Sequence, residues 1–332
     1  MYYNRRIAYH TLGCKLNFSE TSSVAKIMED VGYQKVEFTD VADYYIINTC
    51  SVTENADKEC KYIVRQIKRR APESKVVIMG CYAQLKPQEI ASIEGVSMVL
   101  GAADKFKLDE HILKLTEQTE TLVFNTDYKE LDSFQPAFSA GDRTRTFLKV
   151  QDGCDYFCTF CTIPMARGKS RSATIEQTII EAKKAAATGV KEIVITGVNT
   201  GDFGKSNDGK TRREESFFDL VQALEKIDEV KRWRISSIEP NLLTEGIIDF
   251  VTHSNRWMPH FHIPLQSGSD KILQLMHRKY DTALYQQRIG FIRKTIPHAC
   301  IGVDVIVGFP GETEEDFEAT YQFIHSLDIS YL

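Results

Sequence analysis

The sequence lacks a hydrophobic run that approaches the roughly 20 apolar residues needed to cross a bilayer. Its first residues, Met1–Arg6, have neither the apolar core nor the small-residue cleavage site of a secretion signal. The hydrophobic fraction of 42% and the charged fraction of 26% are ordinary for a globular protein. We therefore expect a cytoplasmic protein with no membrane association.

Positive charge is not in excess either. The formal net charge is −5 at pH 7, which disfavours a protein coated in basic charge for nonspecific nucleic-acid binding. A local basic patch remains compatible with this balance. Lys and Arg cluster in two stretches, which are Lys61, Arg65, Lys68, Arg69 and Arg70, and Arg143, Arg145, Arg167, Lys169 and Arg171. The first stretch is as typical of a solvated helix face as of a phosphate-binding surface.

A length of 332 residues exceeds what one hydrophobic core usually spans, so it favours two domains, although a single closed α/β barrel would also fit. In the first third, strand-like runs alternate with helical segments, which predicts a parallel sheet covered by helices. The predicted strands are Ile7–Leu12, Tyr44–Asn48, Lys75–Gly80 and Met98–Gly101, and the predicted helices are Asn17–Val31, Ala56–Arg70 and Pro87–Ile93. Turn signals between Asp127 and Arg145 mark a boundary. We expect one domain over residues 1–130, a linker over 131–142 and a second domain over 143–332.

The second domain repeats the alternation in roughly six βα units, fewer than the eight of a closed barrel. Its predicted strands include Phe147–Gln151, Glu192–Gly197, Arg232–Ser236, His260–Ile263, Ile301–Val307 and Ile329–Leu332. The fold class expected is therefore α/β, with a partial, TIM-like (β/α)6 barrel after the N-terminal parallel-sheet domain.

Three of the eight cysteines stand together in the spacing CxxxCxxC, as Cys154, Cys158 and Cys161. In a reducing compartment, clustered cysteines bind metal or do chemistry more often than they form disulfides. Three thiolates can hold three irons of a [4Fe–4S] cube and leave the fourth open for a cofactor. Zinc is the competing ligand, but it usually takes four protein ligands, and no second CxxC knuckle exists here. Three chance buried cysteines are the other alternative.

This motif after a barrel strand resembles the radical SAM superfamily, whose open iron chelates S-adenosylmethionine (SAM) and generates a 5′-deoxyadenosyl radical. The resemblance implies SAM contacts from Phe160 beside the adenine and from residues that follow later strands. These residues are Gly197, Asn199, Ser236, Glu239, Gln266 and Gly308. Glycines after strands are more often ordinary turns, so only the ordered set carries weight.

Cys14, Cys50 and Cys81 each follow a predicted strand of the first domain. A lone cysteine is usually a buried small apolar residue. Parallel strands, however, bring their C-terminal ends to one edge of the sheet, where open α/β sheets bind ligands. Three equivalent positions therefore predict that the cysteines converge. Cys60 and Cys300 lack this setting, and we interpret them as packing residues.

The segments Gly-Cys-Lys-Leu-Asn, Asn-Thr-Cys-Ser-Val-Thr, Gly-Cys-Tyr-Ala-Gln and Gly-Cys-Asp-Tyr-Phe-Cys-Thr-Phe-Cys resemble the methylthiotransferases. This resemblance implies a flavodoxin-like N-terminal domain with an auxiliary [4Fe–4S] cluster on Cys14, Cys50 and Cys81. It also implies that Arg167 serves the cofactor or substrate. The residue after the first cysteine is Lys15, which resembles the branch acting on threonylcarbamoyladenosine in tRNA. At this position the isopentenyladenosine branch usually has Gln, and the branch that modifies a ribosomal-protein aspartate usually has Pro.

By this resemblance, the chain uses two [4Fe–4S] clusters and SAM to add a methylthio group at carbon 2 of N-threonylcarbamoyladenosine, position 37, in the tRNA anticodon loop. An electron donor of flavodoxin or ferredoxin type is expected, the sulfur donor is unknown, and we expect a monomer. The family normally ends in a small RNA-binding β-barrel (TRAM) domain, which is absent here, so a truncated chain is expected. Three alternatives stay open. The chain is a methylthiotransferase for isopentenyladenosine in tRNA or for a ribosomal-protein aspartate, another radical SAM enzyme acting on a protein or small molecule, or a noncatalytic iron–sulfur scaffold.

Overall fold

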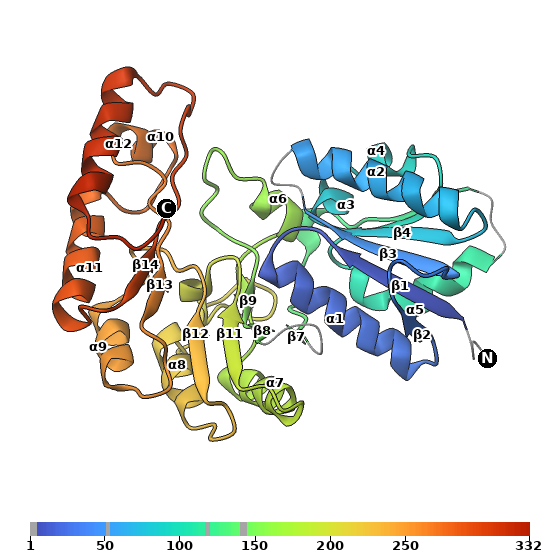
Figure 1. The fold of residues 1–332 in the computed structure, drawn as a ribbon, viewed down its shortest axis with the longest axis horizontal. Coiled ribbons are helices and arrows are strands. Elements are labelled where there is room, and N and C mark those ends of the chain that lie inside the picture. The colour runs from blue at the N-terminus through green and yellow to red at the C-terminus, as the bar shows by residue number, and fades with distance from the viewer. Residues whose placement is uncertain (1–4, 51–53, 117–119, 140–144) are drawn as a thin grey trace. The chain divides into compact units, whose positions relative to one another are not determined.

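The first unit is a six-stranded parallel sheet with helices on both faces, seen in a computed structural model that describes residues 5–50, 54–116, 120–139 and 145–332 (Figure 1). The chain divides into two compact units, residues 1–142 with 162–169, and residues 143–161 with 170–332. Along the described ranges, no helix is long and apolar enough to span a bilayer.

The sheet of the first unit has the order β2-β1-β3-β4-β5-β6, and all its pairs are parallel. Its strands are β1 (Arg6–Thr11), β2 (Gln34–Val36), β3 (Tyr44–Thr49), β4 (Lys75–Gly80), β5 (Val96–Leu100) and β6 (Leu122–Phe124). The helices are α1 (Lys15–Asp30), α2 (Glu54–Arg70), α3 (Cys81–Leu85), α4 (Pro87–Ala91), α5 (Leu108–Ile112) and α6 (Ile163–Arg167). The short elements are η1 (Lys105–Lys107), η2 (Leu113–Thr116), η3 (Tyr128–Glu130) and β7 (Ala137–Phe138).

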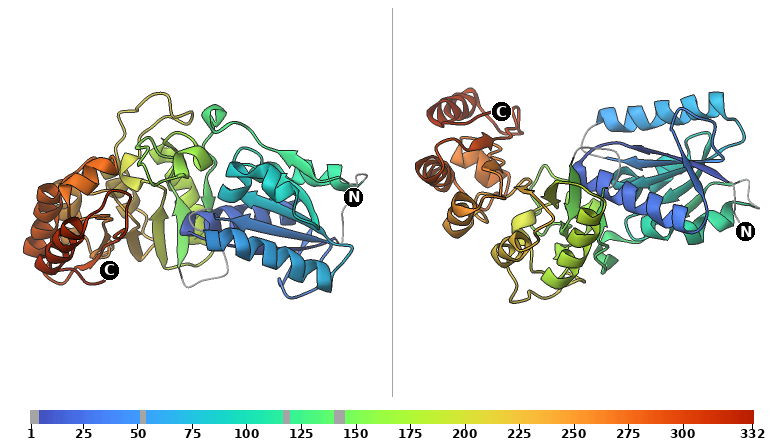
Figure 2. Two further views of the ribbon diagram at one scale, coloured as in Figure 1. Left: turned by 90° about the horizontal axis from the view of Figure 1, so that it is seen from above. Right: turned by 60° about the horizontal axis from the view of Figure 1, so that its bottom comes forward.

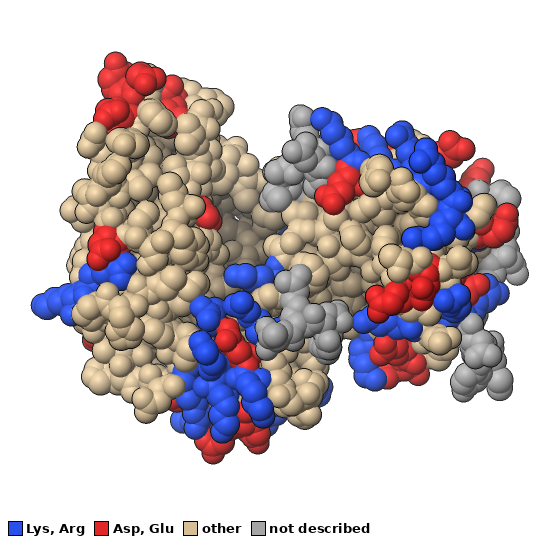
Figure 3. Space-filling model, viewed as in Figure 1, with Lys and Arg blue, Asp and Glu red and all other residues tan. Residues whose placement is uncertain are grey.

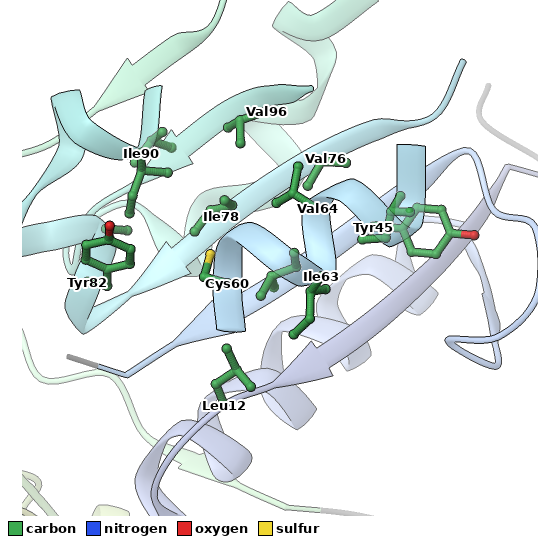
Figure 4. Close-up of a cluster of buried hydrophobic side chains, with 14 of the residues drawn as sticks. Leu12, Tyr45, Cys60, Ile63, Val64, Val76, Ile78, Tyr82, Ile90 and Val96 are labelled. Carbon is green, nitrogen blue, oxygen red and sulfur yellow. The ribbon is translucent and has the colours of Figure 1, made fainter. Parts of the chain in front are cut away.

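Strand β3 shows why this sheet needs helices on both faces. All six of its residues are buried, and successive side chains point to opposite faces. Tyr45 and Ile47 belong to a core that also contains residues of α2, α3 and α4, and Figure 4 shows Tyr45 among its members. Tyr44 and Ile46 belong to a second core, with residues of α1 and α5. The views in Figure 2 agree with this two-sided arrangement of the blue and cyan helices.

The second unit carries parallel strands in the order β8-β11-β12, followed by the pair β13-β14. A parallel bridge between Ser237 and His262 joins the two groups, and a bridge between Gly302 and Tyr331 adds a sixth position. The strands are β8 (Thr146–Lys149), β9 (Gln151–Asp152), β10 (Arg171–Ser172), β11 (Glu192–Thr196), β12 (Arg232–Ile235), β13 (His260–His262) and β14 (Cys300–Gly302). The helical elements are α7 (Ile175–Ala187), η4 (Thr200–Asp202), α8 (Phe217–Glu225), α9 (Glu245–His253), α10 (Asp270–Leu275), α11 (Thr282–Thr295) and α12 (Glu314–Ser326).

The predicted α/β fold class is therefore confirmed in both units. Two strand predictions were wrong in length. The strand expected over Ile301–Val307 is β14, which ends at Gly302, and the strand expected at Ile329–Leu332 is a single bridge at Tyr331. Val307 is 64% exposed, so its apolar character did not indicate burial in a sheet. Cys300 begins β14 instead of preceding it, and Cys60 is fully buried in the core under α2.

Candidate functional site

Cys14, Cys50 and Cys81 follow β1, β3 and β4, which are neighbours in the sheet. Thr11 pairs with Asn48, and Thr49 pairs with Gly80, so the three cysteines leave the sheet at nearly the same level. A Cβ placed on Gly13 would lie 2.9 Å from the Sγ of Cys50, which shows how closely the loop of Cys14 approaches the second cysteine. The first unit thus places these cysteines at the ends of adjacent strands.

Buried charged side chains lie near two buried cysteines of this set. Cys50 and Cys81 are buried, and Cys14 is exposed. Burial raises the pKa of the Cys81 thiol, Arg167 and Lys105 oppose that rise, and Cys14 and Cys50 add to it. Arg167 lies in α6 of the first unit, and its guanidinium pairs with Glu20. Sequence reasoning included Arg167 but missed Glu20 and Lys105, because nothing in the sequence indicates that they are buried.

The other cysteine set lies on a loop after β9 in the second unit. The end of α10 anchors this loop, because the backbone N–H of Thr159 donates to Met276 O and its hydroxyl donates to Leu275 O at 2.9 Å. Gly153 (φ +68°) and Phe157 (φ +49°) adopt left-handed backbone conformations, so the chain turns sharply just before and within this loop. Phe160 is 37% exposed.

Crowding of the three thiols in this loop favours a metal cluster. Burial, with smaller contributions from the neighbouring Cys158 and Cys161, raises the pKa of Cys154 to about 12. Without a cation, the Cys154 thiol stays protonated, whereas bound iron would take it as a thiolate. The donor set therefore fits an iron–sulfur cluster.

Arg278 is a site residue that sequence reasoning missed. Its Nη1 donates to the Sγ of Cys158 at 3.2 Å, its Nη2 donates to Glu239, and its guanidinium lies 4.9 Å from the ring centre of Tyr280. The backbone N–H of Arg278 donates to Leu273 O, so the end of α10 also positions it. No motif marked Arg278, because 120 residues separate it from Cys158.

Polar groups gather where β11 and β12 end. The backbone N–H of Asn199 donates to Gln151 Oε1 at 2.8 Å, and a Cβ on Gly197 would lie 2.8 Å from the same oxygen. The buried side-chain oxygens without a hydrogen-bond partner in the described residues include three in this region, Asn199 Oδ1, Ser236 Oγ and Asn241 Oδ1. Buried polar atoms are normally paired, so these atoms fit a polar ligand such as SAM.

The remaining predicted contacts lie further along the barrel. Gln266 adopts a left-handed conformation (φ +69°) and bridges to Val305. Gly308 (φ +77°) is exposed, and its N–H donates to the Glu312 carboxylate. Within the described residues, no three His, Cys, Asp or Glu side chains converge so as to hold one metal ion. In a [4Fe–4S] cube each thiolate binds its own iron, so convergence on one point is not required.

Three basic residues of the second stretch, Arg145, Arg167 and Arg171, are buried or paired with a carboxylate. Arg167 and Arg171 are buried, and Arg171 pairs with Asp152. Arg145 pairs with Glu192 at 3.7 Å, and Arg143 lies outside the described residues. On α2, four residues of the first stretch, Lys61, Arg65, Lys68 and Arg69, line a groove of about 650 Å³. Its other lining residues are Pro72, Glu89, Ser92, Ile93, Glu94 and Gly95. Figure 3 shows Lys and Arg side chains running along α2.

Comparisons with known proteins agree with this geometry. The family model "Uncharacterized protein family UPF0004" matches residues 6–101, and the model "Radical SAM superfamily" matches residues 148–324, more than half of the chain. The chain is 41% identical over 333 residues to the threonylcarbamoyladenosine tRNA methylthiotransferase MtaB of Bacillus subtilis, covering 98% of this chain and 72% of the relative. It is 33% identical to the tRNA-2-methylthio-N(6)-dimethylallyladenosine synthase of Orientia tsutsugamushi, covering 96% of this chain and 73% of the relative.

Among solved structures, the radical S-adenosylmethionine methyltransferase TsrM from Kitasatospora setae superimposes with a TM-score of 0.72. Its sequence is 13% identical, and the match covers 98% of this chain and 72% of that chain, so this likeness concerns the fold alone. The two sequence relatives are similar over nearly all of this chain. The chain therefore belongs to the radical SAM methylthiotransferases, and to their MtaB-like group.

Proposed function

We propose that this protein adds a methylthio group to carbon 2 of N-threonylcarbamoyladenosine at position 37 of tRNA. The observation that carries the proposal is the convergence of Cys14, Cys50 and Cys81 at three neighbouring strand ends. A radical generator needs one set of cluster ligands, whereas sulfur insertion needs a second cluster as well. The 41% identity to a threonylcarbamoyladenosine tRNA methylthiotransferase supports the substrate.

In this proposal, Cys154, Cys158 and Cys161 hold the cluster that binds SAM, and Cys14, Cys50 and Cys81 hold the auxiliary cluster. Contacts to SAM come from Phe160, Gly197, Asn199, Ser236, Glu239, Gln266 and Gly308. When bound, the clusters and SAM supply the radical that removes hydrogen from carbon 2 and the methylated sulfur that replaces it.

The chain's own side chains prepare this site. Arg278 donates to the sulfur of Cys158 and thereby stabilises negative charge on that ligand. Ser236 Oγ and Asn199 Oδ1 offer unpaired polar atoms at the ends of β12 and β11, where they can orient the polar groups of SAM. The buried setting of Cys158 limits the access of water.

The deciding experiment compares three single cysteine variants in anaerobic assays with tRNA. Cys154→Ala should abolish the release of 5′-deoxyadenosine. Cys50→Ala should retain it but yield no methylthio nucleoside by mass spectrometry. Cys60→Ala removes a core thiol in the same unit and should retain both activities. Continued thiomethylation by Cys50→Ala would overturn the auxiliary role.

A second candidate substrate is the isopentenyladenosine nucleoside, favoured by the 33% identity to a dimethylallyladenosine synthase. Lys15 after Cys14 favours the threonylcarbamoyl branch instead. An assay of methylthio product on tRNA that carries threonylcarbamoyladenosine, and on tRNA that carries isopentenyladenosine, distinguishes the two substrates. A noncatalytic scaffold would cleave no SAM at all.

We further propose that the groove between α2 and α4 binds tRNA phosphates. It presents four cations, Lys61, Arg65, Lys68 and Arg69, against the carboxylates of Glu89 and Glu94. Phosphate contacts supply much of the affinity of RNA-binding proteins. A cytoplasmic, monomeric enzyme that takes electrons from a flavodoxin- or ferredoxin-like protein is consistent with this role.

A further inference from the structure

A buried cluster of three charges lies beside the auxiliary cysteines. Glu20 on α1 is fully buried, and Lys105 Nζ lies 2.7 Å from its Oε2. Arg167 on α6 forks onto the same carboxylate, with Nη1 3.0 Å from Oε1 and Nη2 3.1 Å from Oε2. These side chains, each at most 4% exposed, carry one more positive than negative charge.

Hydrogen bonds link this cluster to the cysteine loops. Nη2 of Arg167 donates to Asn17 Oδ1 at 2.7 Å. Asn17 Nδ2 in turn donates to Leu12 O at 2.9 Å and to Thr49 O at 3.2 Å, the carbonyls that precede Gly13-Cys14 and Cys50. Helix α6 also packs against α3, whose first residue is Cys81. Arg167 therefore connects to the strand ends that carry all three cysteines.

Burying these three charged side chains costs more free energy than filling the same space with apolar side chains. Lys, Arg and Glu are rarely buried unless they are paired, and apolar residues of similar volume usually pack a core at least as well. The fold of a parallel sheet needs no buried cation at this edge. A negatively charged ligand at the cysteines would account for the excess positive charge, and a cluster held by three thiolates is such a ligand.

We propose that Glu20, Lys105 and Arg167 serve the auxiliary cluster, with Arg167 as a positioning residue for the cysteine loops and the excess positive charge as a determinant of the cluster's reduction potential. This inference rests on the proposed function, because it assumes a cluster on Cys14, Cys50 and Cys81. Reduction adds one electron, supplied in the test by dithionite, and a nearby cation stabilises the added negative charge. The cluster is thus easier to reduce than it would be without Lys105 and Arg167.

The test uses the full chain with Cys154, Cys158 and Cys161 changed to Ala, so that only the auxiliary cluster can assemble. Its midpoint potential is measured by a redox titration followed by electron paramagnetic resonance. Lys105→Gln should shift the potential to more negative values, and Glu20→Gln should shift it to more positive values. Lys26→Gln, which removes an exposed cation from the same helix as Glu20, should leave it unchanged.

Shifts of the midpoint potential in opposite directions are the decisive result. A general structural defect would not make the direction of the shift depend on the sign of the charge removed. Shifts in the same direction, or none in a fully loaded protein, overturn the electrostatic role. Arg167→Lys keeps the charge but cannot fork onto Glu20 and Asn17 together, so it should lower the iron content while keeping the potential. Full iron loading by Arg167→Lys overturns the positioning role.

If the protein with Cys154, Cys158 and Cys161 changed to Ala folds but binds no iron, the auxiliary cluster is refuted, and the inference with it. If that protein binds one cluster whose midpoint potential is unchanged by Lys105→Gln and Glu20→Gln, only the inference is refuted. Circular dichroism of each variant separates loss of folding from loss of the cluster. If Glu20→Gln does not fold, the Lys105→Gln shift still decides the sign.

Discussion

At the residue scale, Gly13 is the position where backbone conformation and cysteine placement meet. Its φ of +102° suits glycine, and a Cβ there would lie 2.5 Å from the Cβ of Cys50. Gly13→Ala should therefore displace Cys50 and prevent assembly of the auxiliary cluster. Iron and sulfide analysis after anaerobic reconstitution should show the loss of one of two clusters, while SAM cleavage continues.

Gly189 provides the matched control for that substitution. It also has a left-handed backbone, with φ of +87°, but nothing lies within 4 Å of an added Cβ. Gly189→Ala should introduce backbone strain and leave the iron content unchanged. Equal iron loss in both variants would show that strain, and not the clash with Cys50, is responsible.

A second prediction concerns Arg278, whose side chain is 4% exposed and is paired with Glu239. Arg278→Met should leave the Glu239 carboxylate buried without its cation, which costs about 3–5 kcal/mol of folding free energy. Urea denaturation of the iron-free protein measures this loss. Adding Glu239→Gln should recover part of it, and a double variant no more stable than Arg278→Met would contradict the pairing.

At the element scale, hydrogen bonds to Glu89 link three helices. Its Oε1 accepts hydrogen bonds from Lys61 of α2 at 2.9 Å and from Tyr82 of α3 at 2.8 Å, while Glu89 itself lies on α4. These bonds hold the pKa of Glu89 at about 2, below its ordinary value of 4.5. A lowered acid pKa stabilises the folded state above the unfolded value, and this contribution disappears as the pH falls from 4.5 towards 2.

We therefore expect the stability difference between wild type and Glu89→Gln to be largest at neutral pH and to shrink below about pH 4.5. Denaturation midpoints measured between about pH 7 and about pH 3 test this. Tyr82→Phe keeps the buried ring and removes one donor, so it should show a smaller pH-dependent loss. A difference that stays constant with pH would contradict the role of the ionised carboxylate.

At the scale of the whole molecule, the net charge of −5 requires any attraction for tRNA to come from a local surface. If the groove along α2 binds phosphates, Arg65→Gln with Arg69→Gln should weaken tRNA binding and flatten its salt dependence. The slope of log K against log salt should become shallower by about 0.7–0.9 for each phosphate group that the variant no longer neutralises.

Filter binding or fluorescence anisotropy across a salt series measures that slope. Lys26 lies on α1, which packs on the opposite face of the same sheet, so Lys26→Gln serves as the control. An unchanged slope in the double arginine variant would place the phosphate-binding surface elsewhere on the protein.

The sequence by itself determined the alternation of the main strands and helices and the position of the two cysteine sets after strands. This was possible because apolar alternation and turn residues are local signals, and because parallel strands necessarily end on one edge. It failed where local signals mislead, as at Val307, whose apolar side chain is largely exposed beyond the end of β14.

Only the tertiary structure decided which side chains surround the cysteines. Arg167 pairs with Glu20 across 147 positions, and Arg278 reaches Cys158 across 120. Burial and pairing of charges depend on packing between distant segments, and no local pattern in the chain encodes them. The cysteines could therefore be found from the sequence, whereas the charges that accompany them could not.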